Sequence, residues 1–308
     1  MLLPFLLFIA GLLLLVKGAD ITVDGAKDVA LGMGLSPLFV GTTVIAFGTS
    51  LPELVVTTEA FSLGNFSVGM GNIIGSNIAN IALILGICAL VRPDAISRES
   101  GKMNVQRDMV IMILATGLFI LFSLRATLDI ITGIVFLTCF SLILIRLPRL
   151  EEKPDAVTCT PRPLKYSLAI TVLGIFLVIT GAHLLLAGAV DIARLFLVPE
   201  FLIGFSLVAI GTSLPELATS VAATLKGSID LAVGNVLGSN IFNLIFILGL
   251  NSLFFIIPVP VPWNLVILLA FSLAVLILVF QQSAITRTWG AVMLGAYVGC
   301  IMMLFGFS

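Results

Sequence analysis

The chain has 308 residues, of which 60% are hydrophobic and only 10% are charged, and its formal net charge is −1. Soluble domains carry about 25% charged residues, so this composition argues against a water-soluble protein. The nearly balanced charge points neither to nucleic acid nor to an acidic partner. We therefore expect a protein that lies in a lipid bilayer.

Apolar stretches long enough to cross a membrane recur along the whole chain. A spanning helix needs about 20 mostly apolar residues. Several of the longer stretches contain internal glycine or proline, which is typical of tilted or broken helices. The first stretch lacks the positive start and cleavage site of a signal peptide, so we expect it to remain as a helix. The ten predicted spans are residues 1–17, 30–57, 66–91, 108–124, 126–146, 166–189, 198–224, 229–257, 263–281 and 288–307.

The basic residues indicate how these spans are oriented. If the N-terminus lies outside, the inner loops hold 13 of the 15 Lys and Arg residues, and the outer loops hold only Arg125 and Arg194. An excess of Lys and Arg marks the cytoplasmic loops of membrane proteins. We predict a multi-pass protein of the plasma membrane with both termini on the extracellular side.

The most polar stretch of the chain, RLPRLEEKPDAVTCTPRPLK, covers residues 146–165. Its proline and charge content is typical of a solvated connection, and it is too short to be a domain of its own. With the orientation above, it lies in the cytoplasm and joins two groups of five spans. The predicted parts are a first half over residues 1–146, a linker over residues 147–165 and a second half over residues 166–308.

The two halves contain copies of the same motifs. GTTVIAFGTSLPELVVT (41–57) aligns with GFSLVAIGTSLPELATS (204–220), and GNIIGSNIANIALILG (71–86) aligns with GNVLGSNIFNLIFILG (234–249). The offset is constant, since 216 minus 53, 239 minus 76 and 243 minus 80 all equal 163. Each half has an odd number of spans, so the second copy enters the membrane from the opposite side. We predict an all-α membrane protein of ten transmembrane helices, built as two inverted-topology five-helix repeats, an architecture of many secondary transporters.

Glu53 and Glu216 occupy the same place in the two copies and are the only acidic residues placed well inside the predicted spans. Acidic residues at membrane depth are rare, usually face the interior of the bundle and are functional. Two facing carboxylates with no Lys or Arg at that depth repel each other. A cation between them keeps both ionised, and a divalent cation neutralises both. The alternative is a pair of protonated glutamates that hold helices together by hydrogen bonds.

Residues next to the two glutamates supply further oxygen atoms. Pro52 has no N–H, so the carbonyl of Gly48 loses its helical partner, and the second copy repeats this arrangement. Hydroxyl and amide side chains follow at spacings of three or four residues, which places them on shared helix faces. These side chains are Thr49, Ser50, Ser76 and Asn80 in the first copy and Thr212, Ser213, Ser239 and Asn243 in the second.

The predicted ligand set contains carboxylate, hydroxyl, amide and carbonyl oxygens, with no thiol or imidazole. Hard cations such as Ca²⁺ and Na⁺ prefer these ligands, whereas soft transition metals do not. Mg²⁺ holds its water more tightly and fits less well. We predict a site for transported cations and no resident cofactor. The glycines of GNIIG and GNVLG are predicted to allow close helix packing rather than to bind the ion.

Two GTSLPEL segments, each followed by GN(I/V)(I/L)GSNI, resemble the paired repeats of the calcium/cation antiporter superfamily, most of all its prokaryotic-type sodium/calcium exchanger branch. The resemblance covers nearly the whole chain. It implies an antiporter that moves Ca²⁺ against several Na⁺ ions through one site exposed alternately to each side of the membrane. Ca²⁺ and Na⁺ are then the substrates, and no obligate protein partner is evident.

The resemblance also implies a role for each motif residue. Glu53 and Glu216 are the carboxylates shared by Ca²⁺ and Na⁺. The carbonyl groups of Thr49 and Thr212 complete the calcium site, and the middle of the site is lined by Asn80 and Asn243. The two flanking sodium sites consist of Ala46, Ser50 and Ser76 on one side and Ala209, Ser213 and Ser239 on the other.

Asn243 is a departure from the family pattern, because some members carry aspartate at this position. Both central positions, Asn80 and Asn243, are amides here, which leaves two carboxylates rather than three. Two carboxylates fit one Ca²⁺ by charge, and the middle cation and any dependence on K⁺ stay open. The long regulatory loop of animal exchangers is absent.

Other functions remain as alternatives. An antiporter of the same fold can couple Ca²⁺ to H⁺ or K⁺ instead of Na⁺. A passive cation channel is less favoured, because its filter is usually made by subunit symmetry and this chain completes a two-sided site by itself. The sequence contains no His-Glu pair, Ser-Lys dyad or nucleotide-binding loop, so we do not expect an enzyme.

Overall fold

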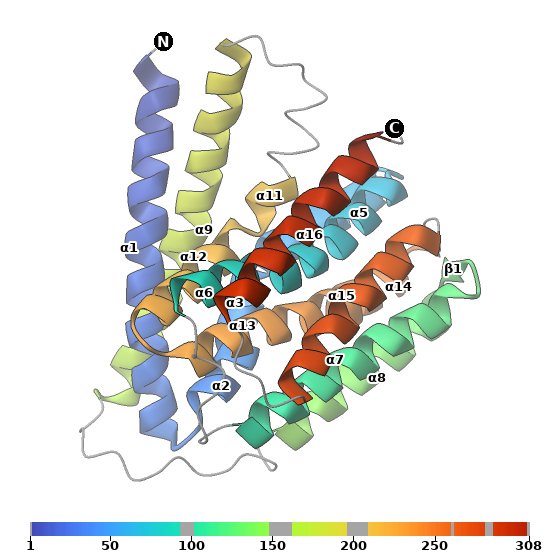
Figure 1. Cartoon of the computed structure of the whole chain (residues 1–308), viewed down its shortest axis with the longest axis horizontal. Helices are drawn as coiled ribbons and strands as arrows, with labels where there is room; N and C mark the ends of the chain where they lie inside the picture. The colour runs from blue at the N-terminus through green and yellow to red at the C-terminus, as the bar shows by residue number, and fades with distance from the viewer. Residues whose placement is uncertain are drawn as a thin grey trace.

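The computed structural model describes residues 2–92, 102–147, 162–195, 209–259, 262–280 and 286–306, and helices make up nearly all of these ranges (Figure 1). The label η marks a π-helix. The first half contains α1 (Leu2–Met33), α2 (Pro37–Val40), η1 (Gly41–Ile45), α3 (Ala46–Thr49), α4 (Leu51–Ser62), α5 (Phe66–Ala79), η2 (Asn80–Ile84), α6 (Leu85–Val91), α7 (Lys102–Ser123) and α8 (Ile130–Arg146).

The second half contains α9 (Leu164–Leu195), α11 (Ala209–Thr212), α12 (Leu214–Leu225), α13 (Ile229–Ile241), η5 (Phe242–Ile247), α14 (Leu248–Ser252), α15 (Pro262–Phe280) and α16 (Arg287–Gly306). Two short strands, β1 (Thr127–Leu128) and β2 (Ile257–Pro258), pair antiparallel across the halves. Most of the predicted linker, and the start of the predicted span 198–224, lie outside the described residues.

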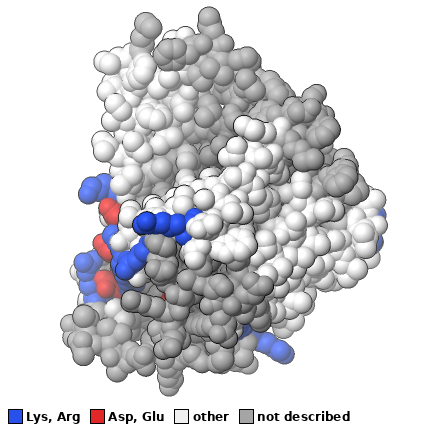
Figure 2. All heavy atoms as spheres, viewed as in Figure 1, with Lys and Arg blue, Asp and Glu red and all other residues white. Residues whose placement is uncertain are grey.

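The outside of the molecule is apolar. Large hydrophobic side chains on several helices are more than half exposed, among them Leu114, Ile134, Val172 and Phe176. Figure 2 shows a largely uncharged face on which acidic and basic side chains gather toward the lower left. Five described helical stretches are long and apolar enough to cross a membrane, and the bent pair of α2–α3 with α4 raises the number to six. The surface is that of a membrane protein, and the count of ten spans stays a prediction.

Helix α1 is longer than the predicted first span of residues 1–17, because it continues without interruption to Met33. The basic residues Lys17 and Lys27 of the stretch 17–33 are among those expected in the inner loops. No proline interrupts it, and its acidic residues Asp20, Asp24 and Asp28 follow at four-residue spacing along one side of the helix. The charged stretch is therefore a helical extension that meets other elements rather than a solvated loop.

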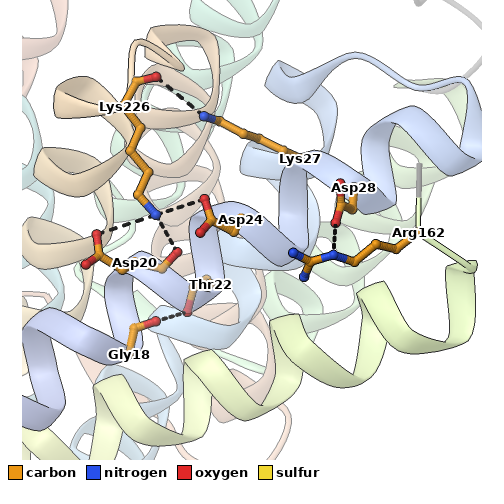
Figure 3. Close-up of polar contacts among 8 residues, drawn as sticks. All are labelled: Gly18, Asp20, Thr22, Asp24, Lys27, Asp28, Arg162 and Lys226. Carbon is orange, nitrogen blue, oxygen red and sulfur yellow. Dashed lines mark hydrogen bonds and ion pairs between the residues drawn. The ribbon is translucent and has the colours of Figure 1, made fainter. Parts of the chain in front are cut away.

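The acidic residues of α1 are held by basic residues from elsewhere in the chain (Figure 3). Lys226, just after α12, places its Nζ atom 3.5 Å from Asp20 Oδ1 and 2.8 Å from Asp24 Oδ1. In return, Lys27 Nζ of α1 lies 3.4 Å from the carbonyl oxygen of Lys226. Arg162, which lies just before α9 in the sequence, forms a further ion pair with Asp28 of α1. These contacts fix one end of α1 to α12 by charge.

Glycines at seven-residue spacing bring α1 and α9 into close contact. A Cβ atom on Gly11 would lie 2.2 Å from the backbone nitrogen of Leu185, and one on Gly181 would lie 2.4 Å from that of Leu15. Any side chain at these positions would push the helices apart. Helices α1 and α9 therefore form one antiparallel unit, which stands upright at the left of Figure 1 while the other long helices are inclined. The full set of glycines is Gly11, Gly18 and Gly25 on α1 and Gly174, Gly181 and Gly188 on α9.

The inclined helices surround α13, η5 and α14, whose side chains are almost all buried. Apolar side chains from α5–α6, α7, α8 and α15 pack around them and form the larger of two hydrophobic cores. The smaller core lies where α1 and α9 meet η1, α12 and α13. The broken helices α2–α4 and α11–α12 thus lie between the upright pair and the inclined helices.

The close contact of α1 with α9 predicts the effect of a single methyl group. We expect Gly181→Ala to lower the free energy of unfolding by about 1–3 kcal/mol, because the added methyl overpacks against the α1 backbone. Gly117→Ala on α7 is the matched control, since a Cβ there meets no described atom within 4 Å, and it should not destabilise the helix. Thermal unfolding of both variants in detergent measures the difference. Equal stability would contradict the tight contact.

Candidate cation site

Helices α4 and α12 begin in the same way at the two copies of SLPEL. Between α3 and α4 the chain bends by 44°. Ser50 joins these helices with φ −86° and ψ 9°, and Ser213 joins α11 to α12 with φ −89° and ψ 5°. Pro52 and Pro215 cannot donate a hydrogen bond to the carbonyl four residues earlier, which accounts for the interruption. The predicted breaks are present in both copies, and they place helix ends inside the protein.

Glu53 and Glu216 lie in the first turns of α4 and α12, and both are fully buried. The N-terminal end of a helix carries a partial positive charge that favours a nearby carboxylate. The C-terminal end of the helix before each break carries a partial negative charge, which favours a cation. Each break therefore offers a stabilised carboxylate beside backbone carbonyl groups.

Each serine at a break reaches the glutamate of the other copy. Ser50 Oγ donates a hydrogen bond to Glu216 Oε1 at 2.9 Å, and Ser213 Oγ lies 3.4 Å from Glu53 Oε1. Ser213 Oγ also lies 3.2 Å from Ser76 Oγ of α5. The structure thus brings both glutamates and three of the predicted serines into one cluster.

Two asparagines that the motif analysis left without a role also cross between the halves. Thr49 Oγ1 donates to Asn235 Oδ1, and Thr212 Oγ1 donates to Asn72 Oδ1, both at 3.2 Å. Each asparagine is also 3.4 Å, through Nδ2, from the backbone carbonyl oxygen of the glutamate in its own half. The signal for them in the sequence was their position in the repeated GN pair, where the neighbouring glycines suggested helix packing instead.

The predicted central asparagines stand at π-helical turns. Helix η2 begins at Asn80, and η5 begins one residue before Asn243. Asn80 Nδ2 donates to Asn240 Oδ1 at 3.0 Å, so α13 contributes a further amide that the sequence did not single out. Isolated π-helical turns are frequent at functional sites.

Several buried polar atoms of this cluster have no hydrogen-bond partner among the described residues. Buried polar atoms are normally paired, because an unpaired one costs about 1–3 kcal/mol. All but one of these atoms are oxygens, and they come from both copies of the motif, so they fit a hard cation. They are Glu53 Oε2, Glu216 Oε2, Asn80 Oδ1, Ser239 Oγ and both amide atoms of Asn243.

The other predicted ligands lie on the same broken helices. Ala46 is buried at the start of α3 and faces α13, where a Cβ added to Gly238 would lie 2.7 Å from its Cβ atom. Ala209 begins α11, and Ser239 is fully buried on α13. Within the described ranges, no group of three or more His, Cys, Asp and Glu residues comes together. The cluster therefore combines two carboxylates with neutral oxygens.

Glu53 and Glu216 are not the only buried acidic residues of the chain. Asp108 is also fully buried. Helix α7 begins earlier than predicted, at Lys102, so Asp108 lies in its second turn rather than at its end. Its carboxylate lies 2.8 Å from the guanidinium group of Arg107 and accepts a hydrogen bond from Thr42 Oγ1 at 3.2 Å. The adjacent arginine neutralises this acid.

The glycine pairs of GNIIG and GNVLG differ in their packing. A Cβ atom would lie 2.4 Å from a carbonyl oxygen of α2 at Gly234, and 2.2 Å from one of η1 at Gly238. Close packing is therefore confirmed for the second copy. At Gly71 and Gly75 an added Cβ meets no described atom within 4 Å, so the described residues do not provide the predicted contact in the first copy.

Known proteins are similar to this chain over nearly its whole length. The family model described as sodium/calcium exchanger protein matches residues 3–147 and 166–306. A putative antiporter CaxA from Alkalimonas amylolytica is 35% identical, in an alignment that covers 99% of both chains. The sodium/calcium exchanger MaX1 from Methanosarcina acetivorans is 29% identical, with 98% of both chains covered.

A solved structure of the sodium-calcium exchanger NCX_Mj matches the fold with a TM-score of 0.88, at 31% identity and with 98% of both chains covered. The fold and the apolar surface, together with these matches, define a helical multi-pass membrane protein of the cation antiporter class, which consists of transporters and not enzymes. The chain belongs to the sodium/calcium exchanger protein family.

Proposed function

We propose that the protein is a secondary active antiporter that exchanges Na⁺ for Ca²⁺ by alternating access at one shared site. The observation that carries this proposal is that Glu53 and Glu216 each have one buried carboxylate oxygen without a partner among the described residues, while the other oxygen is contacted by a serine of the opposite half. Membership of the sodium/calcium exchanger family supports the choice of the two ions.

One Ca²⁺ between Glu53 and Glu216 gives a site without net charge, which lowers the cost of holding charge at membrane depth. Ca²⁺ takes six to eight oxygen ligands in flexible geometry, and the neutral oxygens around the glutamates can supply the remainder. We assign the carbonyl groups of Thr49 and Thr212 to the calcium site, and the amides of Asn80 and Asn243 to its middle. The flanking sodium sites take oxygens from Ala46, Ser50 and Ser76 and from Ala209, Ser213 and Ser239.

Sharing the two carboxylates makes the exchange obligatory. Na⁺ ions in the flanking sites use the same carboxylates as Ca²⁺, so the second ion species binds well only after the first has left. An empty site with two facing carboxylates is unfavourable in a low-dielectric interior, because nothing offsets their repulsion. The carrier therefore changes sides with ions bound, and the gradient of one ion drives the other.

We propose the inverted arrangement of ten helices for the whole chain, with halves at residues 1–146 and 166–308 and a cytoplasmic linker between them. The hydrogen bonds of the site support it, because Ser50–Glu216 and Ser213–Glu53 are related by the 163-residue offset of the repeat. The excess of basic residues on one side supports a plasma-membrane location with both termini extracellular.

Alternating access requires that one part of the protein move past the site. The α1–α9 pair suits this role, because its helices are tightly joined to each other and border the broken helices α3 and α12. We propose that the pair slides across the inclined helices and uncovers the site to one side at a time. The ion pairs of Lys226 with α1 would hold the pair in one position until they are released.

A transport assay tests the proposed exchange. Proteoliposomes loaded with Na⁺ should take up labelled Ca²⁺ from a Na⁺-free medium, and uptake should stop when the Na⁺ gradient is removed. Uptake that follows an H⁺ or K⁺ gradient instead would favour the alternative antiporter of the same fold. Single-channel currents without saturable counterflow would favour a passive channel.

Replacing either glutamate should abolish Ca²⁺ transport. We expect Glu53→Gln and Glu216→Gln each to reduce Na⁺-driven Ca²⁺ uptake to background, because a single remaining carboxylate cannot neutralise the divalent ion. The fold should persist, since each change removes repulsion. Glu59→Gln, at an exposed position of α4, is the control and should transport normally. Normal uptake by either site variant, with the protein folded, would rule out the shared site.

The ion pairs on α1 should influence the transport rate more than the binding of Ca²⁺. We expect Lys226→Gln to change the rate of Ca²⁺ exchange a few-fold, because exposed ion pairs contribute up to about 1 kcal/mol. Ca²⁺ bound at saturation should stay the same. Added salt screens such pairs, so it should affect the unmodified protein more than the variant. An equal response of both proteins to salt would show that Lys226 does not control the movement.

A further inference from the structure

Asn72 and Asn235 each connect three parts of the ion site. Each amide oxygen accepts a hydrogen bond from the threonine at the break of the opposite half. The Nδ2 atom of Asn235 contacts the carbonyl oxygen of Glu216 at 3.4 Å and the hydroxyl groups of Thr219 and Ser220 at 3.0 Å. On the other side, Asn72 contacts the carbonyl oxygen of Glu53 and the hydroxyl of Thr57, which is the repeat counterpart of Ser220. The same arrangement is thus built twice.

These contacts determine how the threonines face the ion. The acceptors around Thr49 Oγ1 include the carbonyl oxygens of Ile45 and Ala46, at 3.1 and 3.5 Å, and the amide oxygen of Asn235 at 3.2 Å. The side chain of Thr49 is therefore committed to its own helix and to α13. Its proton is donated within the protein, and the backbone carbonyl group of Thr49 is the group that we assign to the cation.

An amide suits this position better than other side chains. Asparagine presents an acceptor to the threonine of one half and donors to the glutamate backbone of the other, at the same time. Aspartate cannot donate, and it would add a third negative charge. Asn235 is almost fully buried, so its hydrogen bonds do not compete with water in this structure.

We propose that Asn72 and Asn235 are positioning residues of the cation site, each of which fixes the threonine of the opposite half relative to the glutamate of its own half. This inference rests on the proposed function. The asparagines need not touch the ion, and they hold its carbonyl and carboxylate ligands at a set separation across the halves. Residues that orient metal ligands in this way typically contribute 10–100-fold to metal affinity.

The test compares three alanine variants of the full-length protein. We expect Asn235→Ala and Asn72→Ala to raise the dissociation constant of Ca²⁺ about tenfold or more. Asn251→Ala is the matched control. Asn251 is equally buried, and its Nδ2 atom also crosses between halves, to Thr58 Oγ1 at 3.1 Å, but it lies away from the breaks. Its replacement should lower the melting temperature without changing the Ca²⁺ affinity. Binding of labelled Ca²⁺ and thermal unfolding, both in detergent, measure the two effects.

A second pair of variants separates positioning from direct binding by the hydroxyl. Thr49→Val removes the hydroxyl and keeps the shape of the side chain. If Asn235 acts through Thr49, the double variant Thr49→Val/Asn235→Ala should bind Ca²⁺ about as weakly as Asn235→Ala alone, because the two changes break the same contact. Losses that add together would contradict the inference. So would a much larger loss in Thr49→Val than in Asn235→Ala, since the hydroxyl would then bind the ion itself.

The two proposals fail in different ways. If the unmodified protein binds no Ca²⁺, the proposed function fails. If it binds Ca²⁺ and the Asn235 and Asn72 variants bind it with the same affinity, only the positioning role fails. An effect in Asn251→Ala as large as in Asn235→Ala would show a general loss of structure, and this result would also overturn the positioning role.

Discussion

Two buried carboxylates that approach each other inside a membrane protein repel strongly, because neither water nor salt screens them there. Glu53 and Glu216 are placed in this situation by the breaks before α4 and α12. Helix ends, serine hydroxyls from the opposite half and carbonyl groups next to the breaks surround them. These groups reduce the cost of the charges, and the proposed cation would remove it. The rest of the site is organised around this requirement.

The repeat supplies two copies of each contact, yet the copies are not identical. Ser50 lies closer to Glu216 than Ser213 lies to Glu53. Asn80 is hydrogen bonded to Asn240, whereas the amide of Asn243 has no partner among the described residues. The proposed alternating access requires such a difference between the copies, because a site open to one side cannot be symmetric.

Among the residues that the structure describes, the ion pairs on α1 occur in only one of the two halves of the repeat. Lys226 binds α1, while its counterpart in the first half, 163 positions earlier, is the exposed apolar residue Leu63. Only one end of the α1–α9 unit therefore carries this set of ion pairs within the described part of the chain. In the proposed mechanism, such a difference would favour one conformation over the other.

Much of the residue cluster around Glu53 and Glu216 could be predicted from the sequence, because its chemistry is unusual for its surroundings. A carboxylate after a proline in an apolar span, repeated at a constant offset, has few explanations. The roles of Asn72 and Asn235 could not be predicted, since their partners lie in the opposite half and only the fold brings them together. The predicted first span ended at residue 17, whereas α1 continues to Met33. The charged residues after position 17 do not suit a membrane span, and their ion pairs with Lys226 depend on the fold. The burial of Asp108 could not be predicted, because this residue is the first of the predicted span 108–124 and α7 begins six residues earlier.

The central claim is that both carboxylates hold one ion together. The amount of labelled Ca²⁺ bound per chain at saturation, in the unmodified protein and in Glu53→Gln and Glu216→Gln, tests it most directly. We predict one Ca²⁺ per chain, displaced by Na⁺, and none in either variant at the same concentration. Two Ca²⁺ ions per chain, with one retained after each substitution, would show that the glutamates belong to separate sites and would contradict the account.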